Sequence, residues 1–380
     1  MSLDRRTFLM ASTALAAGAT LGRAADANKY WVFIGCYTGG KGGSKGIGRC
    51  AFDPATGQLG EPETAAEMGS PSFLAIHPNG KFLYAVGEGG GKDGGPVVAF
   101  ALDSKTGKLE KLNQALSGGS GPCHVSVHPK GSHVIVANYG GGSTKIIALE
   151  DGKLNPAKNS FMQHNGSGPN ANRQKEPHAH CSFFDPSGRF ALTVDLGTDL
   201  VWVWNFEQNT GTATGASANI STPPGSGPRH IAIAPDGKFA YVCGELDSTV
   251  NVIQLDLKGG TSKVVQSLST LKEPVKNNST AECILHPNGK FVYVSNRVGN
   301  SIAAFKVGVD RKLTAIGHIT GDINIPRNFN IDPTGSWMLV ANQDGHTVRV
   351  FKMQDDGLAT PTDSIVKYGS PVCVKFAPMG

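Results

Sequence analysis

The sequence contains no stretch in which apolar residues recur with the sustained spacing of a helix, and this absence argues against a helical fold class. It contains no Cys-x-x-Cys pair, which argues against a zinc site built from cysteines. Aromatic residues make up only 7% of the chain, the net charge is only +5, and no basic cluster or aromatic ladder is present. We therefore expect no nucleic acid partner.

Glycine, by contrast, is abundant, with 50 residues among 380, and it takes part in a repeated phrase. Residues 226–245 give the clearest copy, which reads as a loop, a short strand, a tight turn at Pro235-Asp236-Gly237 and a second strand. The turn proline occurs at seven positions: Pro78, Pro129, Pro186, Pro235, Pro287, Pro333 and, in a truncated copy, Pro378. The intervals run from 45 residues, between the last two, to 57 residues, between Pro129 and Pro186. A period of this length is typical of the blades of a β-propeller.

The copies predict four strands in each blade, which we name A to D from the axis outward. Residues 30–38 resemble a strand B without a preceding strand A, and residues 372–376 resemble a strand A on its own. Six complete blades and one blade shared between the two ends make seven. Pairing the ends in one sheet closes the ring and hides its edges. We therefore predict an all-β fold, a seven-bladed β-propeller closed by pairing the C-terminal strand with the N-terminal blade, formed by residues 28–380 as a single domain.

The first 27 residues carry an export pattern and are set apart from the fold. Residues 4–9 read DRRTFL, a twin-arginine pattern, and a modestly apolar stretch over residues 8–21 leads to small residues that allow cleavage after Ala24 or Ala27. The apolar stretch is too short to span a bilayer stably, so we expect no stable membrane insertion. We predict a twin-arginine-type signal peptide in residues 1–27 and a periplasmic protein. The alternative is an N-terminal segment that is disordered or forms an anchoring helix.

The chain has seven cysteines, which raises the question of disulfides in an exported protein. Four of them fall four to six residues before the turn proline of their copy: Cys123, Cys181, Cys283 and Cys373. This position places them on separate inner strands, where we expect small buried thiols. Cys36 and Cys50 lie on neighbouring predicted strands, and whether they pair is left open.

Polar residues gather at one face of the predicted ring. Strands A and B are antiparallel, so the start of A and the end of B lie on the same face of the disc. The starts of the A strands supply His124, His178, His180, Arg229, His230, Glu282 and Arg327. The ends of the B strands supply Glu88, Asn138, Asp195, Glu245, Asn296, Arg297 and Asn342. Residues 163–176, which lengthen the interval before Pro186, read as an inserted loop at this mouth.

A ring of histidine, arginine and glutamate side chains around a narrow opening suits a small anionic ligand. The alternative is that these polar groups bind each other and ordered water, as is common near the axis of a propeller. The arginines favour the first interpretation, because Arg229, Arg297 and Arg327 come from three successive blades and few carboxylates are available to pair with them. Arginine recognises carboxylate or phosphate groups through paired hydrogen bonds.

Three motif matches are set aside. Residues 42–46 fit G-x-S-x-G, but a nucleophile elbow needs a turn from strand to helix, and this segment is a glycine-rich turn between strands. Residues 89–94 fit G-x-G-x-x-G, again without a following helix to hold a phosphate. His178 and His180 share a face of a strand and could offer two metal ligands. A third ligand would have to come from another blade, and acidic residues at the mouth are sparse, so we expect no metal and no cofactor.

Four segments resemble the motifs of a known family: Ser226-Gly227-Pro228-Arg229-His230, Ser295-Asn296-Arg297, Pro326-Arg327-Asn328-Phe329 and Pro177-His178-Ala179-His180. They are similar to the seven-bladed propeller lactonases, which include the bacterial propeller 6-phosphogluconolactonases and the fungal carboxy-cis,cis-muconate cyclases. The likeness extends over residues 30–378. In the cyclase branch the proposed site combines one histidine, two arginines and one glutamate. By motif, the resemblance implies that these are His180 (or His178), Arg229, Arg297 and Glu245 here.

The resemblance implies a metal-independent lactonase, 6-phosphogluconolactonase-like, that acts as a monomer on a small anionic sugar lactone by water attack at the propeller mouth. We assign catalysis to His180, Glu245, Arg229 and Arg297, with His180 or Glu245 as the base and the arginines holding the anionic group or the developing oxyanion. We assign substrate binding to His124, His178, His230 and Arg327. Two alternatives stay open: a carboxymuconate-type cycloisomerase that forms a lactone, and a non-catalytic periplasmic binding or scaffold propeller.

Overall fold

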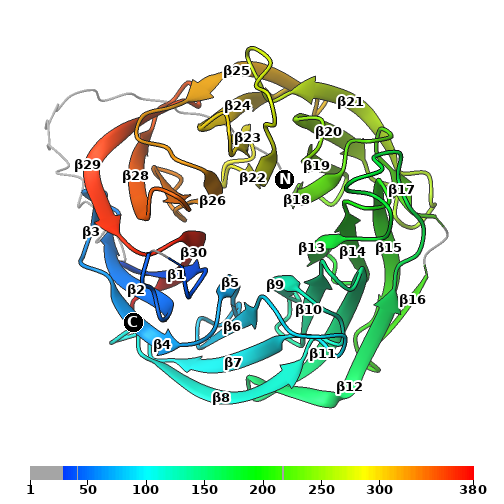
Figure 1. Ribbon diagram of the computed structural model, residues 1–380, viewed down its shortest axis with the longest axis horizontal. Coiled ribbons are helices and arrows are strands. Elements are labelled where there is room, and N and C mark those ends of the chain that lie inside the picture. The colour runs from blue at the N-terminus through cyan, green and yellow to red at the C-terminus, as the bar shows by residue number, and fades with distance from the viewer. Residues whose placement is uncertain (1–28, 41, 216–217) are drawn as a thin grey trace, which may run out of the picture.

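The computed structural model describes residues 29–40, 42–215 and 218–380 of the chain. These residues form thirty strands in seven sheets of four or five strands, arranged around one axis (Figure 1). No helix occurs among the described residues, and hence none with the length and apolar character that a membrane span requires. The prediction of an all-β, seven-bladed propeller is confirmed. The predicted signal peptide, residues 1–27, lies outside the described residues.

Each blade is built from the axis outward, as the sequence predicts (Figure 1). The innermost, or A, strands are β5 (Pro71–Ile76), β9 (Pro122–Val127), β13 (Ala179–Phe184), β18 (Pro228–Ile233), β22 (Thr280–Leu285), β26 (Pro326–Ile331) and β30 (Pro371–Pro378). The second, or B, strands are β1 (Tyr30–Cys36), β6 (Phe82–Gly87), β10 (His133–Asn138), β14 (Phe190–Asp195), β19 (Phe239–Gly244), β23 (Phe291–Asn296) and β27 (Trp337–Asn342).

The two outer ranks complete the blades. The third, or C, strands are β2 (Gly46–Asp53), β7 (Pro96–Leu102), β11 (Ser143–Glu150), β15 (Leu200–Glu207), β20 (Thr249–Gln254), β24 (Ser301–Val307) and β28 (Thr347–Met353). The outermost, or D, strands are β8 (Leu109–Leu116), β12 (Lys153–Gln163), β21 (Lys263–Ser269), β25 (Leu313–Ile319) and β29 (Ala359–Lys367). In two blades this outermost strand is divided, into β3 (Gln58–Leu59) with β4 (Glu63–Glu67) and into β16 (Thr212–Gly215) with β17 (Ile220–Ser221).

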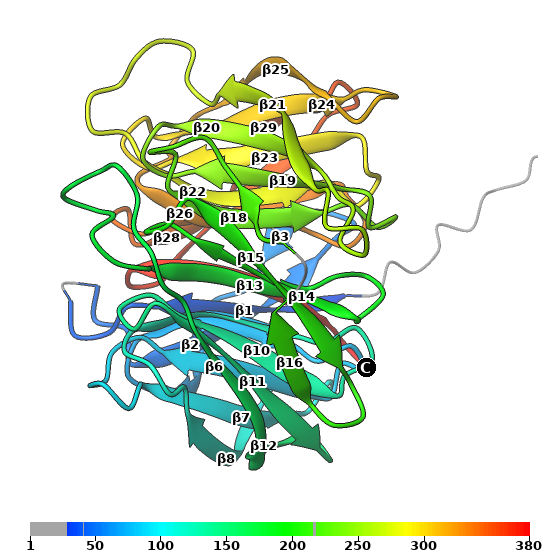
Figure 2. The ribbon, with the colours of Figure 1, turned by 90° about the vertical axis from the view of Figure 1, so that its right-hand side faces the viewer.

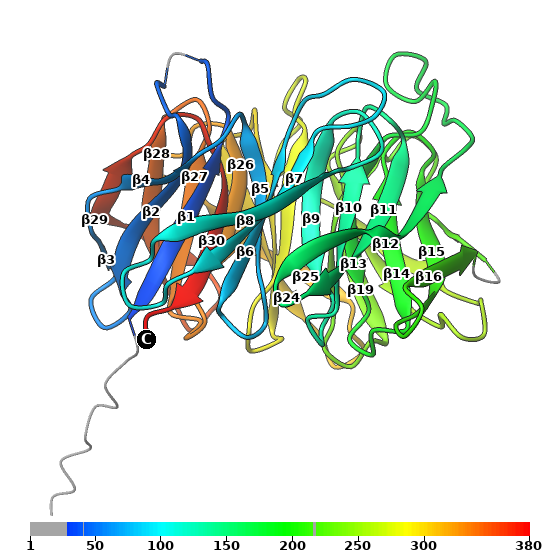
Figure 3. The same ribbon diagram turned by 90° about the horizontal axis from the view of Figure 1, so that it is seen from below.

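The ring is a thick disc whose strands run between its two faces (Figures 2 and 3). We call the face where A strands begin and B strands end the mouth face, and the face that carries the A–B turns the turn face. The segment between β12 and β13 stands out from the mouth face (Figure 3), where the sequence predicts an inserted loop. The antiparallel A–B pairing therefore brings the two predicted sets of polar residues to one face.

The two ends of the chain share one blade, as predicted. β1 pairs with β2 on its outer side and with β30 on its inner side, in a register that runs from Tyr30↔Pro378 to Cys36↔Pro371. β30 is longer than the five residues predicted from the sequence, because it continues to Pro378. In Figure 1 this blade is the one in which the first and the last colours of the chain lie side by side.

The core lies between blades, because each sheet buries apolar side chains on both of its faces. On the closing blade, Val32 and Ile34 belong to a buried cluster with Leu339 of the preceding blade. The alternate residue Phe33 belongs to a different cluster, which contains Leu83 of the following blade. Successive residues of a strand point to opposite faces, so each blade is held by two neighbours.

Turns between C and D strands lock neighbouring blades together. In the turn after β2, Gly57 has φ +74°, and a Cβ atom there would lie 2.4 Å from the ring of Trp337 in the preceding blade. Trp337 also donates through Nε1 to the carbonyl oxygen of Pro54 at 2.8 Å. The glycine therefore serves the turn and the packing at once. The same arrangement recurs one blade later, where Gly107 lies against the ring of Trp31.

Every blade has an irregularity in the pairing of its A and B strands, close to the mouth face. In each case the register omits one or two residues of the A strand, which is the pattern of a β-bulge. The omitted A-strand residues are Ser72, Cys123, His180, Arg229 with His230, Ala281 with Glu282, Arg327 and Val372. A bulge lets neighbouring residues turn their side chains toward the same side, and here that side is the axis.

All seven cysteines are buried free thiols, as predicted for the four on inner strands. The pair left open from the sequence does not form, because the register places Cys50 opposite Val32 rather than opposite Cys36. Cys36 lies four residues further along β1, which is about 13 Å in an extended strand. Its thiol donates to the carbonyl oxygen of Gly46 at 3.0 Å instead.

The seam between β1 and β30 gives the first testable prediction. Deleting residues 371–380 removes β30, unpairs β1 and opens the ring, so we expect the loss of most of the unfolding free energy, which is about 5–15 kcal/mol for a domain. The measurement is thermal unfolding followed by circular dichroism. Deleting residues 379–380 alone leaves β30 whole and is the control. A truncated protein that keeps its Tm within a few degrees would contradict the closure.

Candidate active site

A small cavity lies at the axis near the mouth face. Its lining residues come from the closing blade and from five others: Tyr37, Ser72, Phe73, Glu88, Cys123, His180, Arg229, His230, Arg327 and Val372. Seven of these ten are residues that the A–B register omits. The bulges therefore build the cavity wall. Its volume is about 10 Å³, the space of one water molecule.

Three arginines share one carboxylate beside this cavity. Glu245, directly after β19, lies 2.8 Å from Arg229 Nε, 3.0 Å from Arg297 Nη2 and 2.8 Å from Arg173 Nη2. Burial raises the pKa of Glu245, but Arg297, Arg229 and Arg173 more than offset that effect and lower it to about 2. The carboxylate is therefore ionised at neutral pH and is a weak base.

Backbone contacts fix this cluster, so it is preorganised. The amide of Glu245 donates to Gly227, and the amide of Arg297 donates to Ser279. The guanidinium of Arg229, almost completely buried, donates through Nη1 to the carbonyl oxygen of Ala281 at 2.6 Å. The acceptors are neutral carbonyl oxygens, so these bonds orient the charged groups and leave the positive charge of the arginines unneutralised.

Arg173 was not singled out from the sequence. It lies in the segment between β12 and β13, which was predicted as an inserted mouth loop, and its Nη2 also donates to the hydroxyl of Tyr139 at 3.0 Å. The adjacent Gln174 holds the loop down by donating to the oxygens of Leu196 at 2.9 Å and Asp199 at 2.8 Å. Arg173 is the only arginine of residues 163–176, and this was the feature of the sequence that could have marked it as a site residue.

Arg327 stands apart from the Glu245 cluster. Its guanidinium lies over the ring of Tyr37, 5.4 Å from the centroid. The Tyr37 hydroxyl donates to Glu88 Oε2 at 3.0 Å. Burial raises the pKa of Tyr37 to about 12 in spite of Arg327, so the phenol stays neutral. The mouth thus gathers four arginines around two carboxylates, Glu245 and Glu88.

Three histidines crowd the base of the cavity, with ring centroids 5.4 Å apart for His180 and His230 and 5.5 Å apart for His124 and His230. Burial and, next, Arg229 hold the pKa of His180 well below its usual value. Burial and, next, His230 do the same to the pKa of His124. Only His230 has a carboxylate partner: its Nδ1 lies 2.7 Å from Glu282 Oε1.

The predicted site residues do not all converge. Arg229, His180, His230 and Arg327 line the cavity; Glu245 and Arg297 join it through Arg229; and His124 packs beneath it against Phe73. His178 precedes β13 and stacks on the ring of Tyr139, with centroids 4.6 Å apart, and His180 contacts the same ring edge-on at 5.4 Å. Of the two histidines, only His180 lines the cavity.

Three asparagines at the ends of B strands serve the fold instead. The side-chain amide of each donates to a backbone oxygen of the segment that connects the outermost strand of the preceding blade to the A strand of its own blade: Asn138 to Ser117, Asn296 to Thr270 and Asn342 to Asp322. The interpretation that mouth polar residues bind each other is thus correct for these positions.

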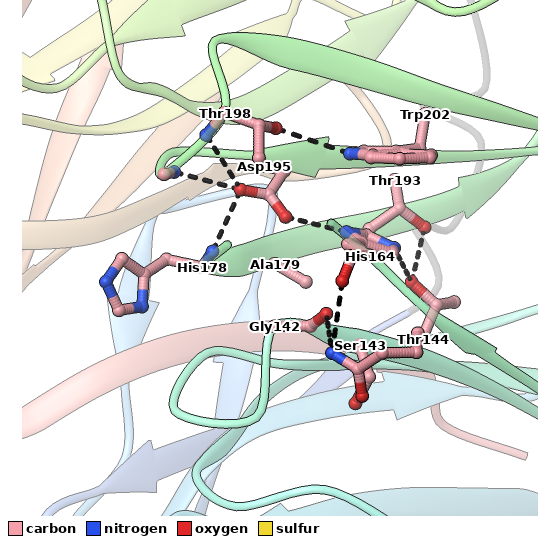
Figure 4. Close-up of polar contacts among 12 residues, drawn as sticks. Gly142, Ser143, Thr144, His164, His178, Ala179, Thr193, Asp195, Thr198 and Trp202 are labelled. Atoms are coloured by element: carbon pink, nitrogen blue, oxygen red, sulfur yellow. Dashed lines mark hydrogen bonds and ion pairs between the residues drawn. The ribbon is translucent and has the colours of Figure 1, made fainter. Parts of the chain in front are cut away.

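A second polar array resembles a catalytic triad (Figure 4). His164 Nδ1 lies 2.6 Å from Asp195 Oδ2, and His164 Nε2 lies 3.0 Å from the hydroxyl of Thr144. The side chains of His164 and Asp195 are fully buried, and the His164 ring stacks on Trp202. Because no substrate reaches a fully buried hydroxyl, the array serves the fold. Asp195 also accepts from the amide of His178 at 2.8 Å, so it fixes the start of β13.

Among the described residues, no group of three or more histidine, cysteine, aspartate or glutamate side chains has the arrangement of a metal site. The histidines of the cavity are paired with a thiol, a backbone amide or a carboxylate. Within this part of the chain, the groups available for chemistry are arginines, histidines and carboxylates.

Fold and site together define a class of proteins. The family profile described as "Lactonase, 7-bladed beta-propeller" matches residues 31–376, and the chain belongs to this family. It is 35% identical over 352 residues to the 6-phosphogluconolactonase of Bacillus subtilis (strain 168), which covers 92% of this chain and 98% of the relative. It is 32% identical over 330 residues to the 6-phosphogluconolactonase of Formosa agariphila, which covers 84% of this chain and 92% of the relative.

A solved structure agrees with these relatives. The periplasmic gluconolactonase of Pseudomonas aeruginosa matches with a TM-score of 0.86 at 29% identity, over 93% of this chain and 100% of that one. The resemblance predicted from the four motifs is therefore confirmed at the level of the family.

The arginine cluster gives a prediction about acid stability. Because the pKa of Glu245 is about 2 in the folded protein, against an ordinary value of 4.5, the carboxylate stabilises the fold above pH 4.5 and loses this effect as the pH falls toward 2. We expect Glu245→Gln to cost about 3–5 kcal/mol at pH 7, because it leaves buried arginines unpaired.

The measurement is urea unfolding of both proteins at pH 7, 5, 4 and 3. The difference in unfolding free energy should shrink toward low pH. The exposed Glu207→Gln is the control, and it should change stability little at every pH. A difference for Glu245→Gln that stays constant down to pH 3 would show that folding does not favour the ionised carboxylate.

Proposed function

We propose that the protein hydrolyses a small sugar lactone that carries an anionic group, of the 6-phosphogluconolactone type, at the mouth of the propeller. The observation that carries the proposal is the excess of positive charge there, with Arg173, Arg229, Arg297 and Arg327 set against Glu245 and Glu88. Membership of the lactonase family and the 6-phosphogluconolactonase names of two relatives support the reaction.

The geometry suggests how such a substrate would lie. The cavity has room for about one water molecule, so only a single small group, such as the carbonyl oxygen of the lactone, would enter it. The anionic group would stay outside, near Arg297 and the half-exposed Arg173. Arg229, which belongs to both the cavity wall and the cluster, would face the carbonyl oxygen and stabilise the oxyanion that forms there. A neutral histidine of the cavity would take the proton of the attacking water.

Glu245 has a different role in this scheme from the one predicted as a possible base. With a pKa of about 2, it accepts a proton poorly at neutral pH. Its contacts with three guanidinium groups hold them at fixed positions, so that they need not reorganise when charge develops on the substrate. We therefore treat Glu245 as a positioning residue.

Hydrolysis is preferred to the two alternatives. The relatives reported above are named for lactonase activity, and no feature of the site favours cycloisomerisation or a non-catalytic scaffold over it. One chain closes the ring, and six of its blades line the mouth cavity, which supports our proposal that the monomer is active.

We also propose that the protein is exported to the periplasm by the twin-arginine-type signal in residues 1–27. The DRRTFL pattern supports this, and the structural relative from Pseudomonas aeruginosa is named a periplasmic gluconolactonase. Export would bring the protein to lactones outside the cytoplasm. Unphosphorylated gluconolactone therefore belongs in the substrate panel beside 6-phosphogluconolactone.

The anion site gives a kinetic prediction. Arg229→Lys and Arg297→Lys keep the charge but lose the planar fork, and loss of a partner in a desolvated charged pair costs about 2–5 kcal/mol, with lysine at the lower end. We expect KM for 6-phosphogluconolactone to rise roughly 30-fold, since 1.4 kcal/mol is a factor of ten.

Steady-state hydrolysis, corrected for spontaneous opening of the lactone, measures this. Arg311→Lys is the matched control, because Arg311 pairs with Asp236 on the turn face and should leave KM unchanged. Gluconolactone, which lacks the phosphate, distinguishes recognition of the anionic group from stabilisation of the oxyanion. An unchanged KM in both mouth variants would end the proposal of an anion site.

Export is tested separately. Changing Arg5 and Arg6 together to lysine should trap the precursor inside the cell, because the signal depends on the arginine pair. The measurement is the share of the protein in the periplasmic fraction. Arg23→Lys, the same substitution in the same segment, should export normally. Periplasmic accumulation of the double variant at the normal level would show that the twin-arginine interpretation is wrong.

A further inference from the structure

His230 is the one cavity histidine whose ring is held by a carboxylate. Its Nδ1 lies 2.7 Å from Glu282 Oε1, and both side chains are almost completely buried. An ionised carboxylate only accepts hydrogen bonds, so Nδ1 carries the proton and the neutral ring has its lone pair on Nε2. Among the described residues no hydrogen bond engages Nε2, and His230 lines the mouth cavity.

Glu282 is itself held from two sides. The amide of Cys283 donates to Oε1 at 3.0 Å, and the side-chain amide of Asn328 donates to Oε2. Asn328 in turn accepts from the amide of Val374 at 2.8 Å. His230, Glu282 and Asn328 thus form a chain across the three successive A strands β18, β22 and β26. Each link limits the freedom of the next, which is the arrangement that orients a general base.

The position of His230 also suits a base that activates water. Its ring lines the mouth cavity and also a larger cavity of about 400 Å³ that extends toward the turn face, between Phe183, Pro235 and Leu285. Glu282 faces only the larger of the two. His230 therefore lies between the mouth cavity and the cavity that extends toward the turn face.

The two bases predicted from the sequence are less well placed. Glu245 accepts from three guanidinium groups and does not line the mouth cavity. His180 Nδ1 lies 3.9 Å from the thiol of Cys123, and among the described residues no carboxylate holds its ring.

We propose that the His230–Glu282 pair is the general base of the lactonase reaction, with Glu282 and Asn328 as positioning residues. His230 Nε2 takes a proton from water as the water oxygen bonds to the lactone carbonyl carbon. The C–O bond of the ring then breaks, and the imidazolium returns the proton to the leaving alkoxide. Lactone and water give the open hydroxy acid, and no other reactant is needed. This inference rests on the proposed function.

The charged groups around His230 define its titration. Besides Glu282, five A strands each contribute one such group: Arg229, which is next to His230 in the chain, His124, His180, Arg327 and Lys375. Burial lowers the pKa of His230, and Glu282 opposes that change. The base is therefore neutral at pH 7, and activity should fall in acid as His230 gains its proton, below the ordinary value of 6.5.

The test uses kcat, KM and the pH profile of kcat/KM on 6-phosphogluconolactone and gluconolactone. His230→Gln should lower kcat by roughly 10²–10⁴-fold with KM changed only a few fold. Glu282→Gln should lower kcat and also move the acid limb to lower pH, because the neutral amide no longer favours the imidazolium. Circular dichroism and the thermal midpoint confirm that each variant folds.

Asn328→Ser keeps both members of the pair and removes the side-chain amide that holds Glu282, together with the acceptor of the Val374 amide. It should lower kcat by a smaller factor, and it serves if Glu282→Gln fails to fold. His180→Gln is the matched comparison and should leave the acid limb in place.

Three outcomes overturn the inference. The base is His180 if His230→Gln keeps kcat within about threefold of the wild type while His180→Gln loses most of its kcat. A loss of kcat in Glu282→Gln without movement of the acid limb gives Glu282 a merely structural role. If the wild-type protein turns over neither lactone, the proposed function itself is refuted. This result differs from one that refutes only the role of the His230–Glu282 pair, in which the wild type is active.

Discussion

The hydrogen-bonded seam between β1 and β30 is the constraint on which the rest of the structure depends. Each blade buries apolar side chains on both of its faces, so it is stable only between two neighbours. A ring of seven meets this requirement for every blade at once, provided that the first and the last strand share a sheet. The seam thus ties the two ends of the chain to the burial of the whole core.

Closure also creates the site. Seven A strands that begin at one face must converge on one axis, and the bulge at the start of each gives extra side chains to that point. The result is a crowded polar core in which Arg229 and His230, neighbours in the chain, both face the cavity. A regular strand would send one of them to the opposite face of its blade.

Blade number, strand order and closure could be predicted because the turn prolines and glycines repeat along the chain, and each copy reports on its own local backbone. For the site, the sequence predicted which polar residues gather at the mouth face but not which of them contact one another. The bulges decide which residues at the start of a strand face the axis. A bulge arises from the pairing of two strands and requires no particular residue type, since Ser72, Cys123 and Arg327 each occupy one. His178 illustrates the limit, because it precedes β13 and does not line the cavity, whereas His180, at the bulge, does. Arg173 could be placed in the mouth loop but not beside its partner, because Glu245 is 72 residues away in the chain.

Two buried glutamates near the axis, Glu245 beside the mouth cavity and Glu282 beside the larger cavity, explain how the site can hold both permanent charge and a group that changes charge. Glu245 is surrounded by guanidinium groups, which stay protonated, so this part of the site is fixed in charge across the neutral range. Glu282 faces an imidazole instead, and its charge supports the protonated form of that ring without enforcing it. Had the partners been exchanged, the arginines would lack their common anchor and His230 would lack its acceptor. The separation of the two carboxylates onto different blades is what allows anion binding and proton transfer to be tuned independently.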